Sequence, residues 1–304
     1  MVSRHLFSVF PVLLLLLFLP LQLAAQAKLY ERKQELCRGI EAQVWVAASG
    51  ANKKQVMSAI NFALTGARES CAVVAEWSQR GETAALNQHA GDGPIPIGLD
   101  LQYLLPRVTQ LAAATEGAFD PTAWSPKRSS YRDIWLDPSQ RRAMLKKKQS
   151  RLSFRGILKG YLADRIAARL QSRGIKRYHV VVAGSAMKAE GRGAHSSWMT
   201  GIPDPHHQDR DSVCRVALVN RALVTVAAYS WDQSEESYPG SAAFASVTVL
   251  APHAHQADAL ANAAMVLGPQ ATATIRSSPG AGAVLISHQG QVSTVGSVPA
   301  VCMR

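Results

Sequence analysis

The chain has 304 residues, a formal net charge of +12, 47% hydrophobic residues and 18% charged residues. This composition indicates a folded protein and excludes an intrinsically disordered one, and the length suffices for one large domain or two small ones. Part of the positive charge lies in a basic run, Arg141 to Lys148, typical of a solvated face but also able to attract a polyanion or a membrane surface. The run lacks interleaved aromatic residues and any nucleic-acid-binding module, so we expect no nucleic-acid partner.

The N-terminus has the pattern of an export signal. Arg4 precedes a nearly continuous apolar run from Val9 to Leu23, and the small-x-small pattern Ala25-Gln26-Ala27 follows it. The run is short for a membrane span, so we interpret residues 1–27 as a cleaved signal peptide in preference to an uncleaved anchor. We therefore expect a protein of the periplasm or cell envelope, without a membrane span in the mature chain.

Cysteine usage agrees with an oxidising compartment. The four cysteines, Cys37, Cys71, Cys214 and Cys302, have neither CxxC nor metal-type spacing. An even number permits two disulfides, and all three pairings remain open.

The first part of the mature chain alternates strand and helix patterns. We predict a strand over 43–47 and helices over 53–78 and 99–114, from alternation and from apolar residues at helical spacing. The segment GAFDPTAW, residues 117–124, is a turn in which Asp120 could cap the backbone or bind a ligand.

Residues 125–152 are polar and basic, and predict a surface connection with a short strand at 151–154.

The segment from Arg155 to Gly184 combines a glycine-bounded turn, a helix and a strand. An apolar stripe from Leu158 to Leu170 predicts the helix, and the valine-rich run 178–183 predicts the strand. Gly156 and Gly160 bracket Lys159 at the helix start. Free N–H groups with a lysine there could bind a phosphate, or the glycines could simply turn the chain.

Further strands are predicted at 198–202 and 245–250, and hairpins over 213–226 and 281–296. Metal-capable side chains follow the first of these strands, and without a framework spacing we favour an exposed loop over a metal site: Asp204, His206, His207, Asp209 and Asp211.

The segment APHAHQADALANAAMVLG predicts a helix with Asp258 and Asn262 on one face. Its packing residues would be Ala257, Leu260, Ala261, Ala264 and Val266. A carboxylate and an amide oxygen side by side could hold a hard cation such as Mg²⁺ together with phosphates, although an ordinary polar helix face has the same spacing.

Five blocks in order over roughly residues 73–285 resemble the FAD:protein FMN transferase family, the ApbE-like flavin transferases. They are GETAALN, GAFDPT, GILKGYLADRI, SWMTGIPDP, and SVTVLAP followed by ADALANAAMVLG. The resemblance implies an α+β fold, with residues 28–304 forming a single mixed α/β domain.

The resemblance also implies a chemistry. A threonine hydroxyl of an exported target protein attacks the FAD pyrophosphate with Mg²⁺ present, AMP leaves, and FMN stays on the protein. By this resemblance, Asp258 and Lys159 are catalytic, and Asp258, Asn262 and the backbone carbonyl of Leu158 bind the metal. The implied flavin-binding residues are Glu82, Asn87, Phe119, Asp120, Gly160, Tyr161, Gly184 and Thr225.

Several family features are altered. The G-G-D after the central strand reads Gly184-Ser185-Ala186, and the T-S-G-x-Y turn reads TVAAY from Thr225 to Tyr229. The H-I-I-D-P-x-T-G block is missing, and a shorter segment, 230–244, takes its place. Three interpretations follow: an active transferase, a homologue with impaired catalysis that binds flavin or a partner, and a structural envelope protein without flavin.

Overall fold

The computed structural model describes residues 27–79, 81–126, 128–193, 197–207, 212–231 and 242–302. The predicted signal peptide therefore lies almost wholly outside the described residues. Within them, no helix has both the length and the apolar character needed to cross a membrane.

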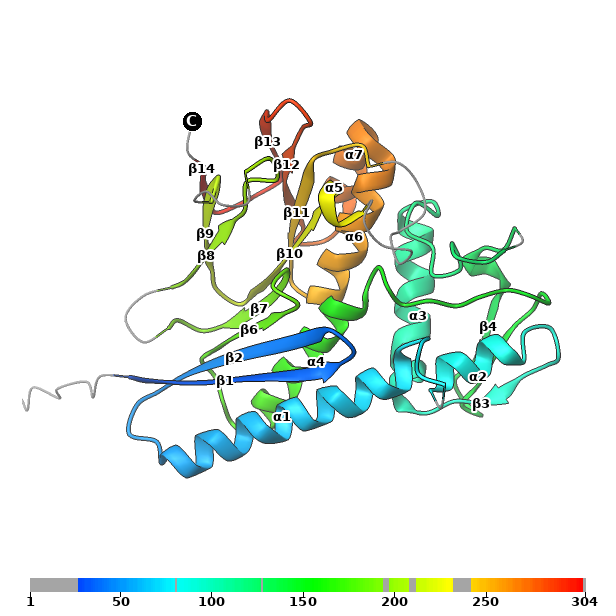
Figure 1. The fold of residues 1–304 in the computed structure, drawn as a ribbon, viewed down its shortest axis with the longest axis horizontal. Helices are drawn as coiled ribbons and strands as arrows, with labels where there is room; N and C mark the ends of the chain where they lie inside the picture. The colour runs from blue at the N-terminus through cyan, green and yellow to red at the C-terminus, as the bar shows by residue number, and fades with distance from the viewer. Residues whose placement is uncertain are drawn as a thin grey trace, which may run out of the picture.

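An antiparallel sheet of eight strands forms the centre of the fold (Figure 1), in the order β1-β2-β6-β7-β10-β11-β12-β13. Its strands are β1 (Lys28–Cys37), β2 (Ile40–Ala48), β6 (Tyr178–Val182), β7 (Ala186–Glu190), β10 (Arg221–Ala227), β11 (Ser246–Ala251), β12 (Gly282–Ile286) and β13 (Val292–Val295). The predicted strands at 43–47, 178–183 and 245–250 and the hairpin at 281–296 are confirmed, with small differences at their ends.

Two three-stranded sheets complete the β-structure, in the orders β14-β9-β8 and β3-β5-β4. Their strands are β14 (Ala300–Cys302), β9 (Cys214–Leu218), β8 (Trp198–Ile202), β3 (Ile95–Pro96), β5 (Arg142–Leu145) and β4 (Ile134–Asp137).

The helices are α1 (Lys53–Val74), α2 (Glu82–Gln88), α3 (Leu99–Ala114), α4 (Leu158–Ser172), α5 (Ala228–Trp231), α6 (Ala254–Leu267) and α7 (Ala271–Ser277), with 3₁₀ turns at Tyr131–Asp133 and Gly268–Gln270. The helices expected over 99–114 and from 158 are confirmed. The helix expected over 53–78 is confirmed only in part, because it ends at Val74 and Ala75 adopts an extended conformation.

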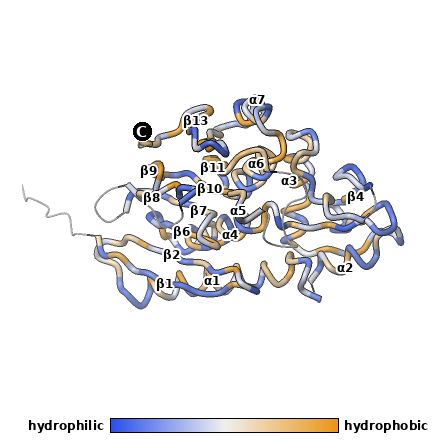
Figure 2. Tube along the Cα trace, turned by 45° about the horizontal axis from the view of Figure 1, so that its top comes forward, coloured by the Kyte–Doolittle hydropathy of each residue, from blue (hydrophilic) through white to orange (hydrophobic). Residues whose placement is uncertain are grey.

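Alternation along the strands gives the central sheet two buried faces. Val224 and Val249 belong to the main core with α1, α4 and α6, whereas their neighbours Leu223 and Leu250 belong to a second core against β8 and β9. Successive strand side chains point to opposite faces, so a purely apolar run such as Leu223-Val224 requires cover on both. In Figure 2 the hydrophobic positions gather in α6 and the strands beside it.

Two sequence expectations about strands are wrong. Residues 213–218 and 221–227 form strands, but β9 pairs with β8 and β14 whereas β10 pairs with β7 and β11. The turn at Asn220, where φ is 51°, thus leads from one sheet to the other and closes no hairpin. The expected short strand at 151–154 is extended chain without strand pairing, and strands β4 and β5 lie earlier in that segment.

Two disulfides tie peripheral elements to the cores. Cys37 at the end of β1 is bonded to Cys71 of α1, and Cys214 of β9 to Cys302 of β14. This pairing, first with second and third with fourth, resolves the three alternatives that the sequence left open.

Candidate functional site

The contact between α4 and α6 is unusually close at Gly160. A Cβ atom built on this residue would lie 2.2 Å from the carbonyl oxygen of Ala254 and 2.8 Å from the amide nitrogen of His255. No other residue type fits there without separating the helices. The glycine in the Lys159-Gly160 pair is therefore required by helix packing, whatever ligand the turn binds.

The same approach places Asp258 of α6 against the first turn of α4. The Gly160 N–H donates to Asp258 Oδ2 at 2.9 Å. Asp258 is fully buried, and burial raises the pKa of its carboxyl group, while the charge of Lys159 and the Gly160 hydrogen bond act in the opposite direction. Lys159 itself is partly buried. A buried carboxylate beside a lysine at a helix start suits the handling of charged substrates.

Asn262 lies one turn after Asp258, as the sequence predicted, and the two are in contact. The Asn262 amide nitrogen donates to Asp258 Oδ1 at 3.2 Å, to the Asp258 carbonyl at 2.9 Å and to the Gly156 carbonyl at 3.2 Å. Both side chains are buried, so the alternative of an ordinary polar helix face is wrong. Val266, expected to pack, is 38% exposed instead.

These donors fit a hard cation. Three oxygen atoms, from the Asp258 carboxylate and the Asp258 and Gly156 carbonyls, surround one point that the Asn262 amide nitrogen now occupies. With the Asn262 side chain turned so that its oxygen joins these three, a cation could take the place of the amide nitrogen, and carboxylate and carbonyl oxygens are the ligands of Mg²⁺. The contacting carbonyl is that of Gly156; Leu158, the predicted carbonyl ligand, is the first residue of α4.

Asp164, one turn after Gly160, caps α6 from α4. Its carboxylate accepts the Ala254 N–H at 3.0 Å and the His255 N–H at 2.9 Å, and lies 2.6 Å from His255 Nδ1. Burial tends to raise the pKa of Asp164, but the His255 contacts and the two N–H groups together hold it below its usual range. This role was not predicted, since local sequence gives no signal for a cap supplied from about 90 residues away.

Tyr161 is fully buried, and its hydroxyl donates to Asp100 Oδ1 at 2.5 Å. Asp100 also accepts a hydrogen bond from Ser70 at 3.2 Å and lies 3.4 Å from Arg165. Asp100 thus joins α1, α3 and α4. The predicted flavin contact of Tyr161 stays a prediction, because the side chain has a structural role in this position.

Glu82 and Asn87 of α2 also have structural partners. Glu82 accepts the Gly98 N–H at 2.8 Å, directly before α3. Asn87 forms two hydrogen bonds with the Leu152 backbone, to its N–H at 2.7 Å and its carbonyl at 2.9 Å. These side chains shape the chain around the site, and their predicted flavin contacts stay predictions.

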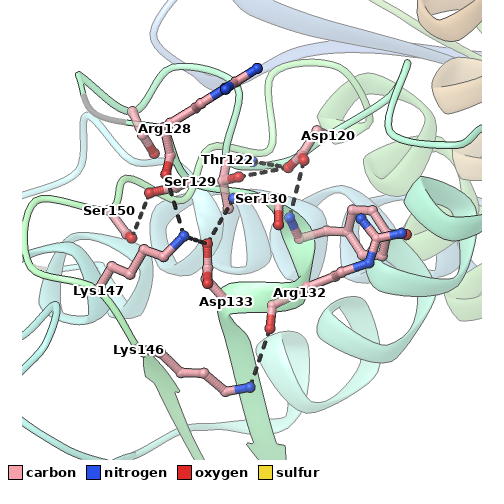
Figure 3. A network of polar contacts seen from close by, with 12 residues as sticks. Asp120, Thr122, Arg128, Ser129, Ser130, Arg132, Asp133, Lys146, Lys147 and Ser150 are labelled. Atoms are coloured by element: carbon pink, nitrogen blue, oxygen red, sulfur yellow. Dashed lines mark hydrogen bonds and ion pairs between the residues drawn. The ribbon is translucent and has the colours of Figure 1, made fainter.

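Phe119 is buried in the main core, and Asp120 organises the loop after it. Asp120 Oδ1 accepts the Thr122 N–H and hydroxyl, both at 2.7 Å, and Oδ2 accepts the Tyr131 N–H at 3.0 Å. Figure 3 shows these bonds beside the Lys147–Asp133 ion pair of the basic segment. The capping alternative for Asp120 is confirmed, and ligand binding by Phe119 and Asp120 stays a prediction.

Gly184 and Thr225 lie near one another at the end of β6 and in β10. Gly184 has φ of 66° in the turn before β7, and the next residue, Ser185, accepts the Thr225 N–H through its carbonyl at 3.0 Å. The Thr225 hydroxyl lies 2.9 Å from that of Thr248. Within the described residues the Ser185 hydroxyl is buried without a hydrogen-bond partner, so a polar ligand group would satisfy it.

Of the metal-capable loop residues, Asp204, His206 and His207 are described, while Asp209 and Asp211 lie outside the described residues. His206 Nε2 lies 3.3 Å from the Ser287 carbonyl, and His207 lies 3.2 Å from Asp204. The part of the chain that the structure describes gathers no metal-ligating trio in this loop, and the exposed-loop interpretation stays a prediction.

Comparisons with known proteins relate this chain to a family. The sequence model of the ApbE family matches residues 125–286. An FAD:protein FMN transferase of Treponema pallidum is 26% identical over 257 residues, covering 67% of this chain and 70% of the relative. One of Haemophilus influenzae is 25% identical over 239 residues, covering 65% and 69%.

Solved structures show the same fold. The flavinyl transferase ApbE of Pseudomonas stutzeri, in its apo form, superposes with a TM-score of 0.73 at 22% identity, covering 90% of this chain and 95% of its own. The ApbE protein of Thermotoga maritima gives a TM-score of 0.74 at 21% identity, covering 88% and 97%. The matched family segment contains the α4–α6 contact and more than half of the sequence, and this chain belongs to the ApbE family.

Proposed function

We propose that the protein transfers FMN from FAD to a threonine of an exported target protein, with Mg²⁺ present and release of AMP. The observation that carries the proposal is the buried carboxylate of Asp258, held by the Gly160 N–H and in contact with Asn262 beside Lys159. The relatives named above as FAD:protein FMN transferases support the reaction type.

The reaction replaces the phosphoanhydride bond of FAD with a phosphoester bond to the target protein. The threonine oxygen forms a bond to the FMN-side phosphorus of the pyrophosphate as its proton is lost, and the bond from that phosphorus to the AMP oxygen breaks. Negative charge grows on the phosphate oxygens and on the leaving AMP. Lys159 at the start of α4 would lie against this charge, where a fixed cation stabilises the transition state.

Asp258, Asn262 and the Gly156 carbonyl would hold the cation. When bound there, Mg²⁺ would neutralise pyrophosphate charge and orient the phosphates. The protein itself would keep the Asp258 carboxylate ionised and shielded from water. Gly160 contributes to this through its N–H, and the close approach of α4 and α6 excludes water.

Export is part of the proposal. The signal-like N-terminus and the two disulfides both suit an oxidising compartment, in which such bonds persist. The acceptor would then be another exported protein of the periplasm or cell envelope.

The altered residues favour a second candidate, a homologue that binds flavin or a partner without efficient transfer. Asn262 offers an amide in place of the hydroxyl of the family's threonine, and its amide nitrogen now fills the oxygen cluster. Ala186 stands where the family has an acid.

One experiment distinguishes the two candidate functions. Quenching of FAD fluorescence is measured with and without Mg²⁺, followed by AMP release in the presence of a threonine-containing acceptor. Mg²⁺-enhanced binding with AMP release supports transfer, and binding without AMP release supports the second candidate in its flavin-binding form. Absence of FAD binding contradicts transfer and flavin binding and leaves partner binding as the function.

Asn262→Thr tests the cation geometry separately. We expect tighter Mg²⁺-dependent FAD binding, because a hydroxyl removes the amide group from the oxygen cluster. Asn262→Ser is the matched variant with the same hydroxyl and should behave alike. Unchanged Mg²⁺ dependence in both variants would show that α6 holds no cation.

A further inference from the structure

Two imidazoles and a carboxylate meet where α6 begins. His253 directly precedes the helix, His255 is its second residue, and Asp164 reaches them from α4. One donor atom from each of the three side chains lies within 4.8 Å of the other two. The two imidazole rings are stacked, with centroids 5.3 Å apart. Among the described residues, this is the one group of three such side chains that meets this spacing.

We propose that Asp164, His253 and His255 form a second metal site, selective for Zn²⁺ and similar divalent transition metals. Imidazole nitrogens with a carboxylate oxygen are the donors that Zn²⁺ prefers, whereas Mg²⁺ prefers oxygen alone. Ligand atoms around one tetrahedral Zn²⁺ lie about 3.4 Å apart, given metal–ligand bonds of about 2.1 Å. The donor atoms of the trio therefore have to move closer together to bind a metal, and His253, the exposed member, is the one with room to do so.

The Asp164 carboxylate is the member of the trio that favours a cation. Asp164 is fixed by two backbone N–H groups, so its carboxylate is already in place before any metal arrives. The charges of Lys188 and Arg107 act on His253 and oppose a cation there, but both side chains are held by backbone carbonyls: Lys188 donates to that of Pro252 at 2.7 Å, and Arg107 to that of Tyr103 at 2.8 Å. Arg107 also stacks on the Tyr103 ring, 3.5 Å from its centroid.

The trio also borders open space. His253 and His255 line a hollow of about 470 Å³ together with Tyr103, Arg107 and Ser278. Three protein ligands leave a fourth tetrahedral position, as in zinc sites that bind water or a substrate. That position would face the hollow, where Arg107 supplies a positive charge for an anionic ligand group.

This site is separate from the one at Asp258. Asp258 contacts the Gly160 N–H and Asn262, and its neighbouring donors are oxygen atoms. His255 lies three residues earlier in α6 and contacts Asp164 instead. The two sites therefore differ in donor chemistry, and Mg²⁺ in excess should not displace Zn²⁺ from the histidines.

The competing explanation is that His255 and Asp164 only cap α6 and bind no metal. The test uses the protein without an affinity tag, treated with a chelator and then titrated with Zn²⁺ by calorimetry and with Co²⁺ by visible absorption. We expect one equivalent of each metal, unaffected by excess Mg²⁺, and a Co²⁺ spectrum with nitrogen ligands.

His253→Ala is the decisive variant, because this side chain is exposed and its removal should leave the fold intact. We expect Zn²⁺ affinity to fall about tenfold or more. The matched control is the double variant His206→Ala with His207→Ala, which removes two exposed histidines elsewhere and should leave the affinity unchanged. Absence of Zn²⁺ binding by the wild-type protein, unchanged affinity in His253→Ala, or loss of affinity in the control would each overturn the proposal.

Discussion

Two carboxylates of this protein, Asp120 and Asp258, are both buried, but their partners differ in kind. Asp120 bonds to Thr122 and Tyr131, which lie 2 and 11 residues away. Asp258 bonds to Gly160, 98 residues away, at the closest approach of two helices.

The difference distinguishes a carboxylate that stabilises its own loop from one that tertiary packing places in a candidate site. The hydrogen bonds of Asp120 to Thr122 and Tyr131 stay within its own loop, so folding of the loop accounts for its position. For Asp258, burial raises the pKa of the carboxyl group, so the ionised form costs free energy that local folding does not explain. Of the two, Asp258 is the acid whose position suggests function.

The largest effect is expected from Gly160→Ala, which disrupts the helix packing around Asp258. The added Cβ would meet the Ala254 backbone at 2.2 Å, which forces α4 and α6 apart and breaks the Gly160–Asp258 bond. We expect a loss of about 3 kcal/mol or more in the free energy of unfolding, measured by urea denaturation. The matched control is Gly66→Ala in α1, whose added Cβ has the end of the Arg169 side chain as its nearest contact. There we expect a change of about 1 kcal/mol or less, and equal losses in the two variants would contradict the account.

His179 extends the comparison to a partly buried titratable residue that is neither a loop carboxylate nor a member of the candidate site. It is stacked between Trp45 and Trp198, with centroids 5.4 and 5.7 Å away, and burial lowers its pKa to about 4. In the unfolded chain His179 takes up a proton near pH 6.5, whereas in the folded protein it does so only near pH 4. The free energy of unfolding therefore decreases as the pH falls from about 6.5 to about 4. The total loss is about 3 kcal/mol.

The free energy of unfolding of the wild-type protein and of His179→Phe should therefore be compared at neutral pH and near pH 4.5. Phenylalanine keeps an aromatic ring between the two tryptophans but cannot be protonated. We expect the variant to lose the part of the pH dependence that lies between about 6.5 and 4. If both proteins show the same acid destabilisation, His179 is not its source.

A smaller effect is expected from Asp120→Asn, which perturbs the loop that Asp120 stabilises. The amide puts an N–H₂ group where a carboxylate oxygen accepts a hydrogen bond, either from Tyr131 or from Thr122. We expect a cost of about 2 kcal/mol, with faster hydrogen exchange confined to residues 117–133. The control is Asp137→Asn, an exposed turn carboxylate that accepts bonds from Ser139 and Gln140. Exchange that also spreads to α6 would show that the two regions are coupled.

The sequence predicted best those elements whose signal is local. The stripe from Leu158 to Leu170 and the valine-rich run before Gly184 gave α4 and β6 almost to the residue. The spacing of Asp258 and Asn262 correctly placed the two on one helix face.

Sequence reasoning failed where pairing depends on distant partners. The strands around Asn220 were predicted as a hairpin, but β9 belongs to the β14-β9-β8 sheet and β10 to the central sheet. No local sequence pattern shows that Asp164 caps α6. None shows that the side chains of His253 and His255 lie close to the Asp164 carboxylate. Helix spacing also left open whether Asp258 was exposed or buried, because burial depends on α4, about 100 residues earlier.

The most direct test of the central claim is Asp258→Asn, with FMN transfer and the free energy of unfolding measured on the same protein. Burial raises the pKa of Asp258, so the ionised carboxylate lowers stability at neutral pH, and this cost vanishes once the pH falls below about 3.9. The neutral amide should therefore leave the protein as stable as the wild type or more stable, by on the order of 1 kcal/mol at neutral pH. Transfer should fall by about 100-fold or more, since the charge has been removed. Retained transfer together with lost stability would contradict the account, because Asp258 would then serve the fold and not the reaction.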